Sequence, residues 1–452
     1  MVEDQLDQHG VAVPLYGAQR WLALYLETNS DGQPCHSGIE PLWEVWLIRG
    51  KVSAALLAEA LRLVVAEADV FEGKPHSSPQ GVRLVRDGSP SPGVELLDLS
   101  GRGRLTWRQL TLCFARAVSL PFDLRRDTPI RFAIAQTSSA HTFLLVVADH
   151  FILDGQSLRL LIRRAAKAYG HLLQGEPRLA RRAASSDSFF AHLRRTFSLK
   201  EEWDASEGYW RRRAREPTWG PLVQGASKPW RQSRIGGAQI MPLTQAEKRM
   251  MRMLSTEWKL GLGDFFSAVV TLVVAPGAAR LPSILHSRHG RTVPPAARVL
   301  GPLWEQVFTC PPRDMDLPLR QWVQSFAAEL EATPPLLGRA VADVWGDALA
   351  RDRSLVVANV IPAAPSYGFG AGAGRPVDME LPLNGAFDEE RCALGFALLR
   401  QRGGPWQLLL QYDRDMYPAP GRLMSAVRKV ILQCANHPEA PARNVLASLG
   451  HR

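Results

Sequence analysis

The sequence predicts an α/β fold divided between two lobes. Strand-prone runs alternate with segments of helical periodicity along the chain, an order typical of α/β proteins. The chain has 452 residues, more than one ordinary hydrophobic core supports. Residues 143–148 are almost all apolar, which indicates a strand covered on both faces within such a sheet.

The elements expected in the first lobe follow from helix-capping residues and hydrophobic spacing. In chain order they are a short helix from 13–21, a helix after Ser53 with its apolar face at 56–65, a strand at 81–85, a helix at 106–118, a strand at 130–136 paired with the strand that ends at His150, and a helix at 156–171.

Residues 174–177 form a polar stretch that ends in Pro, and we expect the lobe boundary there, giving lobes 1–178 and 179–452. The second lobe should contain helices at 188–215 and 264–274 and strands at 284–286 and 356–360. The Gly-rich residues 367–376 lack the strand–glycine–helix context of a phosphate loop, so we expect a flexible loop.

One junction carries the chemistry: Ala148 to Gly155, between the apolar strand and the next helix. Successive side chains of a strand alternate faces, so Asp149 and His150 should point in opposite directions. Asp154 or Ser157 is suited to accept the free amide hydrogens where the helix begins. This order predicts an imidazole at a strand end, close to backbone amides, which is how a general base is mounted.

The amino-acid composition limits which partners, metals and cellular compartment we expect for this site. The net charge of +10, with clustered arginines, is consistent either with attraction to an acidic partner or with arginines on solvated helix faces, and no nucleic-acid-binding motif accompanies it. No apolar run is long enough to span a bilayer, and the acidic N-terminus does not resemble a signal peptide. The five cysteines are scattered without metal-ligand spacing. We expect a reduced cytoplasmic protein that binds no metal, membrane or nucleic acid.

The junction resembles the His-His-x-x-x-Asp-Gly motif of nonribosomal peptide synthetase condensation domains and of the related acyl-CoA-dependent acyltransferases. Further matching segments follow the family's order along nearly the whole chain, at 13–21, 48–53, 207–211, 290–291, 300–303 and 409–417. The resemblance implies a V-shaped pseudo-dimer of two chloramphenicol-acetyltransferase-like lobes with a central tunnel.

The resemblance also implies an activity and partners. Such domains transfer an acyl or aminoacyl group from phosphopantetheine on an acyl- or peptidyl-carrier protein to an amine or alcohol. The acceptor is a small molecule or is carrier-bound, and the domain itself binds no cofactor. No adenylation, thioesterase or carrier motif is visible, so we expect a free-standing, monomeric enzyme.

Catalytic roles carry over from the family. His150 would act on the acceptor nucleophile, and the Gly155 amide would lie near the developing oxyanion. Asp154 would be paired with an arginine, for which Arg291 matches best and Arg288 is the reserve.

Three further residues are assigned to the substrate tunnel, namely Asn359, Trp304 and Ser157. For Trp304 the alternative of a plain core position is slightly favoured.

The chain departs from the motif at Asp149, which replaces the first His. Asp149, Asp154 and Ser157 match the Asp-x-x-x-x-Asp-x-x-Ser pattern of heterocyclization domains, but those domains lack the second His and the Gly that are present here. Two other readings stay open. One is an acyltransferase that uses free acyl-CoA, because residues 366–370 distantly echo a Gly-aromatic element of such enzymes. The other is a catalytically silent domain that recruits a carrier protein or an oxygenase.

Overall fold

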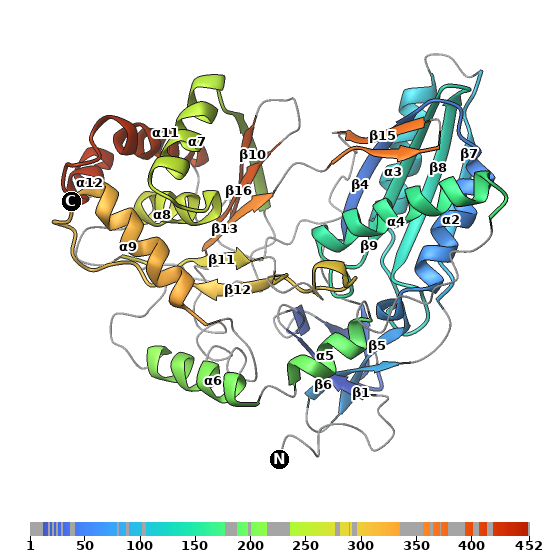
Figure 1. Cartoon of the computed structure of the whole chain (residues 1–452), viewed down its shortest axis with the longest axis horizontal. Coiled ribbons are helices and arrows are strands. Elements are labelled where there is room, and N and C mark those ends of the chain that lie inside the picture. The colour runs from blue at the N-terminus through green and yellow to red at the C-terminus, as the bar shows by residue number, and fades with distance from the viewer. Residues whose placement is uncertain are drawn as a thin grey trace. The chain divides into compact units, whose positions relative to one another are not determined.

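The chain forms two compact units. The computed structural model describes residues 12–450 except for 17–18, 20–21, 24–25, 29, 37–40, 79–80, 87–89, 102–104, 177–187, 198–199, 215–235, 276–280, 289, 292–295, 335–355, 362–364, 371, 378–393, 401–405 and 414–418. Unit 1 combines the described residues of 1–203, 289–304 and 364–387, and unit 2 those of 204–288, 305–363 and 388–452. Each unit contains one six-stranded sheet (Figure 1).

The sheet of unit 1 is mixed. In spatial order its strands are β14 (Tyr367–Phe369), β15 (Gly372–Val377), β4 (Leu42–Arg49), β9 (His141–Ala148), β8 (Ile130–Ser138) and β7 (Gly93–Asp98). Only β7 and β8 are parallel, and all other neighbours are antiparallel. The predicted pairing of β8 with β9 is therefore confirmed.

Helices cover both faces of this sheet. Helix α3 (Leu105–Ser119) packs Phe114 against Leu145 and Val147 of β9. Helices α2 (Ala54–Ala66) and α4 (Gly155–Leu173) pack together on the opposite face (Figure 1). Residues 144–148 are all fully buried, as their apolar sequence predicted.

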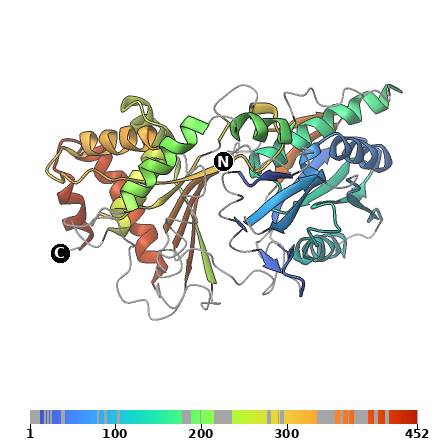
Figure 2. The ribbon, with the colours of Figure 1, turned by 90° about the horizontal axis from the view of Figure 1, so that it is seen from below.

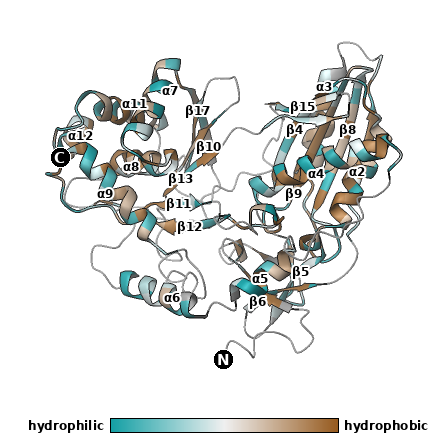
Figure 3. Ribbon diagram, viewed as in Figure 1, coloured by the Kyte–Doolittle hydropathy of each residue, from teal (hydrophilic) through white to brown (hydrophobic). Residues whose placement is uncertain are grey.

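Smaller elements complete unit 1. They are β1 (Ala12–Pro14), β5 (Gly73–Ser78) and β6 (Gly81–Arg86) in one three-stranded sheet, the pair β2 (Glu27–Thr28) and β3 (Pro34–His36), the short helices η3 (Asp69–Glu72) and η6 (Ala296–Arg298), and helix α5 (Phe189–Phe197). Helix α6 (Lys200–Ala214) follows α5 and is mostly hydrophilic, whereas β8 is largely hydrophobic (Figure 3).

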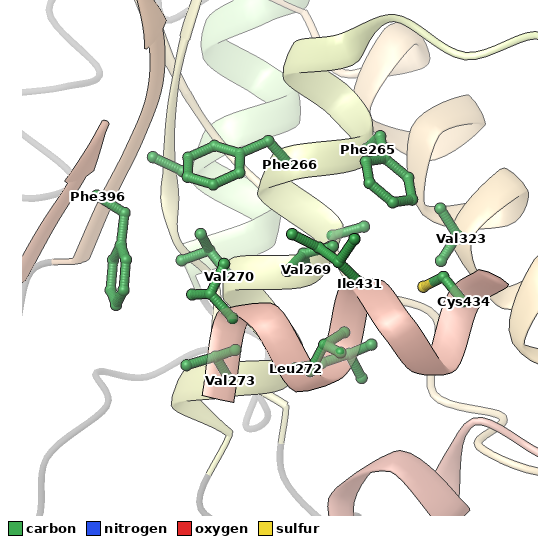
Figure 4. Packing of buried hydrophobic residues seen from close by; sticks show 14 of the residues in the cluster. Phe265, Phe266, Val269, Val270, Leu272, Val273, Val323, Phe396, Ile431 and Cys434 are labelled. Carbon is green, nitrogen blue, oxygen red and sulfur yellow. The ribbon is translucent and has the colours of Figure 1, made fainter. Parts of the chain in front are cut away.

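The sheet of unit 2 has helices on one face. Its strands, in spatial order, are β10 (Gly236–Pro242), β17 (Gln407–Asp413), β16 (Leu394–Leu399), β13 (Val356–Ile361), β11 (Leu285–Arg288) and β12 (Glu305–Phe308). Its helices are α7 (Gln245–Glu257), α8 (Leu262–Val274), α9 (Leu319–Ala332), α11 (Pro420–Asn436) and α12 (Arg443–Leu449), gathered on one side (Figure 2). Figure 4 shows the core between them, where Phe266 and Val270 of α8 lie with Phe396 and Ile431.

The two sheets share a four-stranded pattern. In unit 1 the order β4-β9-β8-β7 has two antiparallel pairs followed by a parallel pair. In unit 2 the order β10-β17-β16-β13 repeats those directions. A helix follows β9 and another follows β17. The α/β class is confirmed, and the chain contains a structural repeat that its sequence does not display.

Four expectations need correction or comment. Residues 12–14 form strand β1, paired with β6, so the short helix expected from 13–21 does not begin at residue 13. Residues 367–376 form the hairpin of β14 and β15 rather than a flexible loop, since glycines let the strands approach closely: Gly370 adopts φ +58° at the turn, and a Cβ on Gly374 would lie 2.4 Å from the Phe369 ring. The expected 188–215 helix is two helices, α5 and α6. The boundary at 178 lies outside the described residues, and the units do not divide at one point, because 289–304 and 364–387 group with unit 1.

No helix among the described residues combines the length and apolar character needed to cross a membrane.

Candidate active site

The predicted motif lies in the turn between β9 and α4. The carbonyl of Asp149 accepts hydrogen bonds from the amides of Ile152 and Leu153, each at 3.1 Å. The Asp149 carboxylate accepts a further bond from the Phe151 amide at 2.8 Å. Backbone and side chain of one residue therefore close the turn, which is the behaviour that favours Asp in such positions.

Asp149 and His150 have different surroundings, in agreement with their expected opposite directions. Asp149 is buried, and its negative charge acts on Arg131 of β8, where burial lowers the arginine pKa and the charges of Asp127 and Asp149 oppose that shift. His150 is half-buried and contacts Trp304 instead. The residue that replaces the first motif His therefore bonds to the backbone of the turn and acts on Arg131, whereas the imidazole contacts Trp304.

The position of His150 fixes its neutral tautomer. Its Nδ1 lies 3.1 Å from the Leu153 carbonyl oxygen. A carbonyl oxygen can only accept, so in the neutral ring Nδ1 carries the hydrogen and Nε2 carries the lone pair. The Trp304 ring stands beside it, with centroids 5.2 Å apart and planes tilted by 43°. The side chain is therefore oriented to accept a proton at Nε2.

Asp154 connects three segments of unit 1. Its Oδ1 accepts a hydrogen bond from the Ser157 amide at 2.7 Å and so caps α4. Its Oδ2 accepts from Arg291 Nη1 at 2.5 Å and from the Leu303 amide at 3.0 Å. Because Leu303 precedes Trp304, the same carboxylate also holds the segment that carries the ring beside His150.

Arg291 is the partner that the sequence favoured for Asp154. The side chains of this ion pair are only 3% and 5% exposed. Arg291 Nη2 donates to Ser157 Oγ at 2.6 Å and to the Gly301 carbonyl at 3.0 Å. Ser157 Oγ in turn donates to the Gly301 carbonyl at 2.7 Å. Dense hydrogen bonding of this kind is what makes a buried charge pair tolerable.

The reserve candidate, Arg288, has other partners. It lies at the end of β11 in unit 2 and donates to the carbonyl oxygens of Leu330, in the last turn of α9, and of Thr333, the C-cap of that helix. Arg288 therefore anchors the end of a helix. Of the two candidate arginines, Arg291 is the one that pairs with Asp154.

Gly155 stands at the first turn of α4. The amides of Ser157 and Leu158 bond to Asp154, whereas no acceptor among the described residues is recorded for the amides of Gly155 and Gln156. A Cβ added to Gly155 would meet no atom within 4 Å. Amide hydrogens and the helix dipole both favour negative charge at such a terminus. The geometry suits an oxyanion close to this backbone.

The three residues assigned to the tunnel differ. Trp304 contacts His150, as described. Ser157 is fully buried within the Asp154–Arg291 network, which is a structural position. Asn359 is half-buried on β13 of unit 2, and its neighbours Val356 and Ala358 point into the helix-covered core, so Asn359 lies on the other face of that sheet.

Sequence reasoning missed one residue that holds the motif. Gln19 is fully buried, its Nε2 donates to the Phe151 carbonyl at 3.0 Å, and its Oε1 accepts from the Tyr16 amide at 3.3 Å. The signal was present, because Gln19 lies in the 13–21 segment that matches the family's opening. That segment indicated family membership but gave no partner for the glutamine.

Among the described residues no group of three or more His, Cys, Asp or Glu side chains is arranged to hold a metal ion.

Comparisons with known proteins identify the family and the fold of the chain. The family model of the condensation domain matches residues 42–302. No curated protein compared with the chain matches it. Among solved structures, the starter condensation domain of rhizomide synthetase RzmA is 16% identical, with a TM-score of 0.70 over 98% of this chain and 99% of that one.

Two further structures are similar along their length. SgcC5 from Streptomyces globisporus is 14% identical, with a TM-score of 0.73 over 95% of this chain and 100% of that one. The X-domain of teicoplanin biosynthesis, solved with OxyB, is 16% identical, with a TM-score of 0.71 over 96% and 95%. These likenesses show the fold, and the family model covers more than half of the 452 residues. The chain therefore belongs to the condensation domain family.

Proposed function

We propose that this condensation domain transfers an acyl or aminoacyl group from a carrier-protein phosphopantetheine thioester to an amine or alcohol. The observation that carries the proposal is the hydrogen bond between His150 Nδ1 and Leu153, because it leaves Nε2 as a proton acceptor. The first amide of α4, that of Gly155, follows five residues after His150 along the same turn. A base and an oxyanion donor on one junction are the parts that acyl transfer needs.

The reaction then proceeds in two steps. As the acceptor nitrogen or oxygen bonds to the thioester carbonyl carbon, Nε2 of His150 takes the proton that the acceptor loses. The carbonyl oxygen becomes an oxyanion, towards which the Gly155 amide donates. When the carbon–sulfur bond breaks, its electron pair leaves on sulfur and the imidazolium returns the proton to give the pantetheine thiol. Acid–base assistance of this kind contributes about 10² to 10⁴ in rate.

The contacts of the two aspartates favour condensation over heterocyclization. Asp149 closes the turn and Asp154 caps α4 while pairing with Arg291. Both carboxylates are buried and occupied by structural bonds. Neither is free to serve as a second acid or base, whereas His150 is half-exposed beside them.

Two features guide the choice of donor and partner. The net charge of +10 suits an acidic carrier protein, which long-range attraction would steer towards the chain. A relative was solved in complex with C8-CoA, so the CoA thioester is the competing donor. We also propose that the protein acts as a cytoplasmic monomer without a bound cofactor.

The test follows discharge of an acyl-loaded carrier protein by intact-protein mass spectrometry, with candidate amines and alcohols present and the matching acyl-CoA in a parallel reaction. His150→Ala is compared with His141→Ala, which removes an exposed imidazole at the other end of β9. We expect carrier discharge to a new amide or ester in the wild type and in His141→Ala, with a loss of about 10²-fold or more in His150→Ala. Discharge of the CoA ester alone would identify an acyl-CoA transferase. Carrier binding without discharge would identify a recruiting domain.

A further inference from the structure

Three cations gather around one tryptophan of unit 2. Trp406 precedes β17 and is only 1% exposed. The guanidinium carbons of Arg252 and Arg400 lie 5.0 and 5.2 Å from the centroid of its ring, and Lys248 Nζ lies 5.8 Å from the same centroid. Lys248 and Arg252 are four residues apart on α7, whereas Arg400 follows β16. Two distant segments of the chain thus bring their positive charges to a single ring.

The ring holds these charges together against their mutual repulsion. The electron-rich face of an indole attracts cations that lie within about 6 Å of its centroid. Like charges four residues apart on a helix repel one another, as do charges that share one ring. Nε of Arg400 is buried and has no hydrogen-bond partner among the described residues. These side chains therefore fold back onto the protein and concentrate positive charge, where solvated arginines would spread into water.

The acidic side chains of α7 do not balance this charge. Glu247 lies 2.8 Å from Nε of Arg428 and also accepts from the backbone at the start of the helix. Glu257, at the end of the helix, pairs with Arg320. Within the described part of the chain, no ion pair is recorded for either of the two guanidinium groups beside Trp406. A carboxylate from outside the chain would find both of them available.

Exposed arginines on other helices are balanced within the chain. Arg211 of α6 pairs with Glu207, one turn earlier on the same helix. Arg62 of α2 pairs with Glu59 in the same manner. The cations around Trp406 are therefore more than an instance of the arginine-rich composition.

The exposed side of α7 extends the charged surface. Arg249 and Arg252 are exposed, and Met253 beside them is 54% exposed. Spacings of three and four residues place these side chains on one strip of the helix. Arginine and methionine are enriched at protein interfaces, and methionine adapts to partners of different shape. We call Lys248, Arg249, Arg252, Met253 and Arg400 the α7 patch.

We propose that the α7 patch docks the acidic surface of the carrier protein that delivers the acyl group. The inference rests on the proposed function, because that function supplies an acidic protein partner. Charge complementarity carries the inference: the patch presents four cations around an exposed methionine. The net charge of +10 would attract such a partner to any part of the chain, whereas the patch gives the attraction one place.

Two double variants with the same change in net charge test this location. Arg249→Glu with Arg252→Glu reverses the charge of the patch, and Arg108→Glu with Arg116→Glu does so at exposed positions of α3 in unit 1. Titration calorimetry measures the Kd of an acyl-loaded carrier protein at low and at high salt. The patch variant should raise Kd at least about tenfold and flatten its salt dependence, because like charges then face each other. The α3 variant should stay within about twofold of the wild type.

The kinetic test compares the carrier with a donor that has no protein surface. The patch variant should raise KM for the acyl-loaded carrier in parallel with Kd, while kcat stays unchanged. With the same acyl group on free pantetheine, kcat/KM should stay within about twofold, because this donor does not need the patch. Arg249→Glu alone leaves the contacts with Trp406 in place and should still raise Kd about threefold.

The outcomes separate this inference from the proposed function. If the wild type binds the carrier without discharging it, the proposed function fails, while the Kd values of the variants still decide the inference. Equal weakening in both double variants would assign the attraction to net charge and overturn the inference. An unchanged Kd in the patch variant would overturn it as well, as would a matching loss with acyl-pantetheine. Weaker binding of a DNA duplex, with carrier binding intact, would identify a nucleic-acid surface instead and equally overturn it.

Discussion

Two strand-to-helix junctions occupy equivalent places in the two sheets, and the candidate site lies at the one after β9. After β9, the Asp154 carboxylate caps α4 and joins the turn to Arg291. After β17, helix α11 begins at Pro420 with Ala419 at its N-cap and without a side-chain cap. The repeated scaffold therefore provides a strand end and a helix start twice, while the residues of a single turn convert one copy into a candidate site.

The strands that lead to these junctions differ in how fully they are buried. Residues of β9 are buried on both faces, whereas burial in β17 alternates between buried and half-buried from Trp406 to Gln411. In unit 1 the segment between β7 and β8 contains α3, which covers the second face. The described part of the corresponding segment in unit 2, between β13 and β16, forms β14 and β15 in the sheet of unit 1 instead.

The face of the unit 2 sheet opposite its helices has both exposed and buried positions among the described residues. Pairing aligns Ile240, Leu409, Ala397 and Asn359 in one row across four strands of that face. Ile240 is 56% exposed. The row is apolar except for the amide of Asn359, so this residue has the position that a substrate-facing role would require, a role that stays a prediction.

The largest effect should come from breaking the ion pair that distinguishes the two junctions. Arg291→Ala leaves the Asp154 carboxylate buried without its guanidinium and should reduce the free energy of unfolding by about 3–5 kcal/mol. The matched pair in unit 2, Arg443 with Asp316, is 57% and 66% exposed, and Arg443→Ala should cost at most about 1 kcal/mol. Urea unfolding of both variants measures the contrast. Equal losses would mean that burial does not separate the two pairs.

Acidification should affect a buried histidine in each unit. Burial is the main cause that lowers the pKa of both His192 and His286 from 6.5 to about 4. Below pH 6.5 these histidines bind protons in the unfolded state but stay unprotonated in the folded state. Their contribution to the free energy of unfolding is therefore fully present above pH 6.5 and is lost as the pH falls towards 4. At 1.36 kcal/mol per pH unit, His286 alone accounts for about 3 kcal/mol.

The comparison of pH 7 with pH 4.5 in urea unfolding checks this effect. His286 bonds to Ser267 Oγ at 2.7 Å through Nδ1, and His286→Gln removes the titrating group from that position. The variant should lose less stability on acidification than the wild type does. His437 is exposed, so the His437→Gln variant should lose as much stability on acidification as the wild type does. If His286→Gln loses as much free energy of unfolding between pH 7 and pH 4.5 as the wild type does, the acid sensitivity belongs to other groups.

Local patterns predicted the elements that local forces determine. Ser53 caps α2 as its residue type indicated, and the apolar run of β9 is buried as expected. The hairpin of β14 and β15 was misjudged because glycine weakens a strand, and its partner β4 lies more than 300 residues away in sequence.

In the candidate site, too, the sequence predicted the local features but not the contacts between distant residues. The turn residues and the pairing of Asp154 with Arg291 were predicted, the latter only because a family resemblance supplied a long-range contact. Gln19 was missed, since its importance lies entirely in a neighbour, Phe151, that folding brings to it. A single sequence contains no local pattern for such contacts.

Asp149, the departure from the family motif, should matter for stability more than for turnover. Asp149→Ala removes the acceptor of the Phe151 amide, and leaving this buried donor unpaired should cost about 1–3 kcal/mol. Asp149→Asn keeps an acceptor and should cost less than 1 kcal/mol by the same reasoning. Because His150 bonds to Leu153 independently, both variants should keep their turnover per folded molecule. A large drop in kcat in a folded Asp149→Asn would give this carboxylate a role in the chemistry.

The smallest effect concerns the uncapped junction. Ala419 stands at the N-cap of α11, and Ser, Asp or Asn at such positions accepts a bond from the next turn of the helix. Ala419→Asp should therefore raise the free energy of unfolding by about 0.5–1 kcal/mol, the dipole of the helix adding to the cap. The gain should appear as a higher urea midpoint, with an unchanged dependence of the free energy of unfolding on urea concentration.

The backbone at Ala419 has ψ 62° rather than the extended value found at Asp154. A gain well below about 0.5 kcal/mol would therefore mean that Pro420 holds the N-cap in a geometry that a side chain cannot use. The two junctions would then differ in backbone as well as in side chains, and transferring the Asp154 cap would require rebuilding the turn itself.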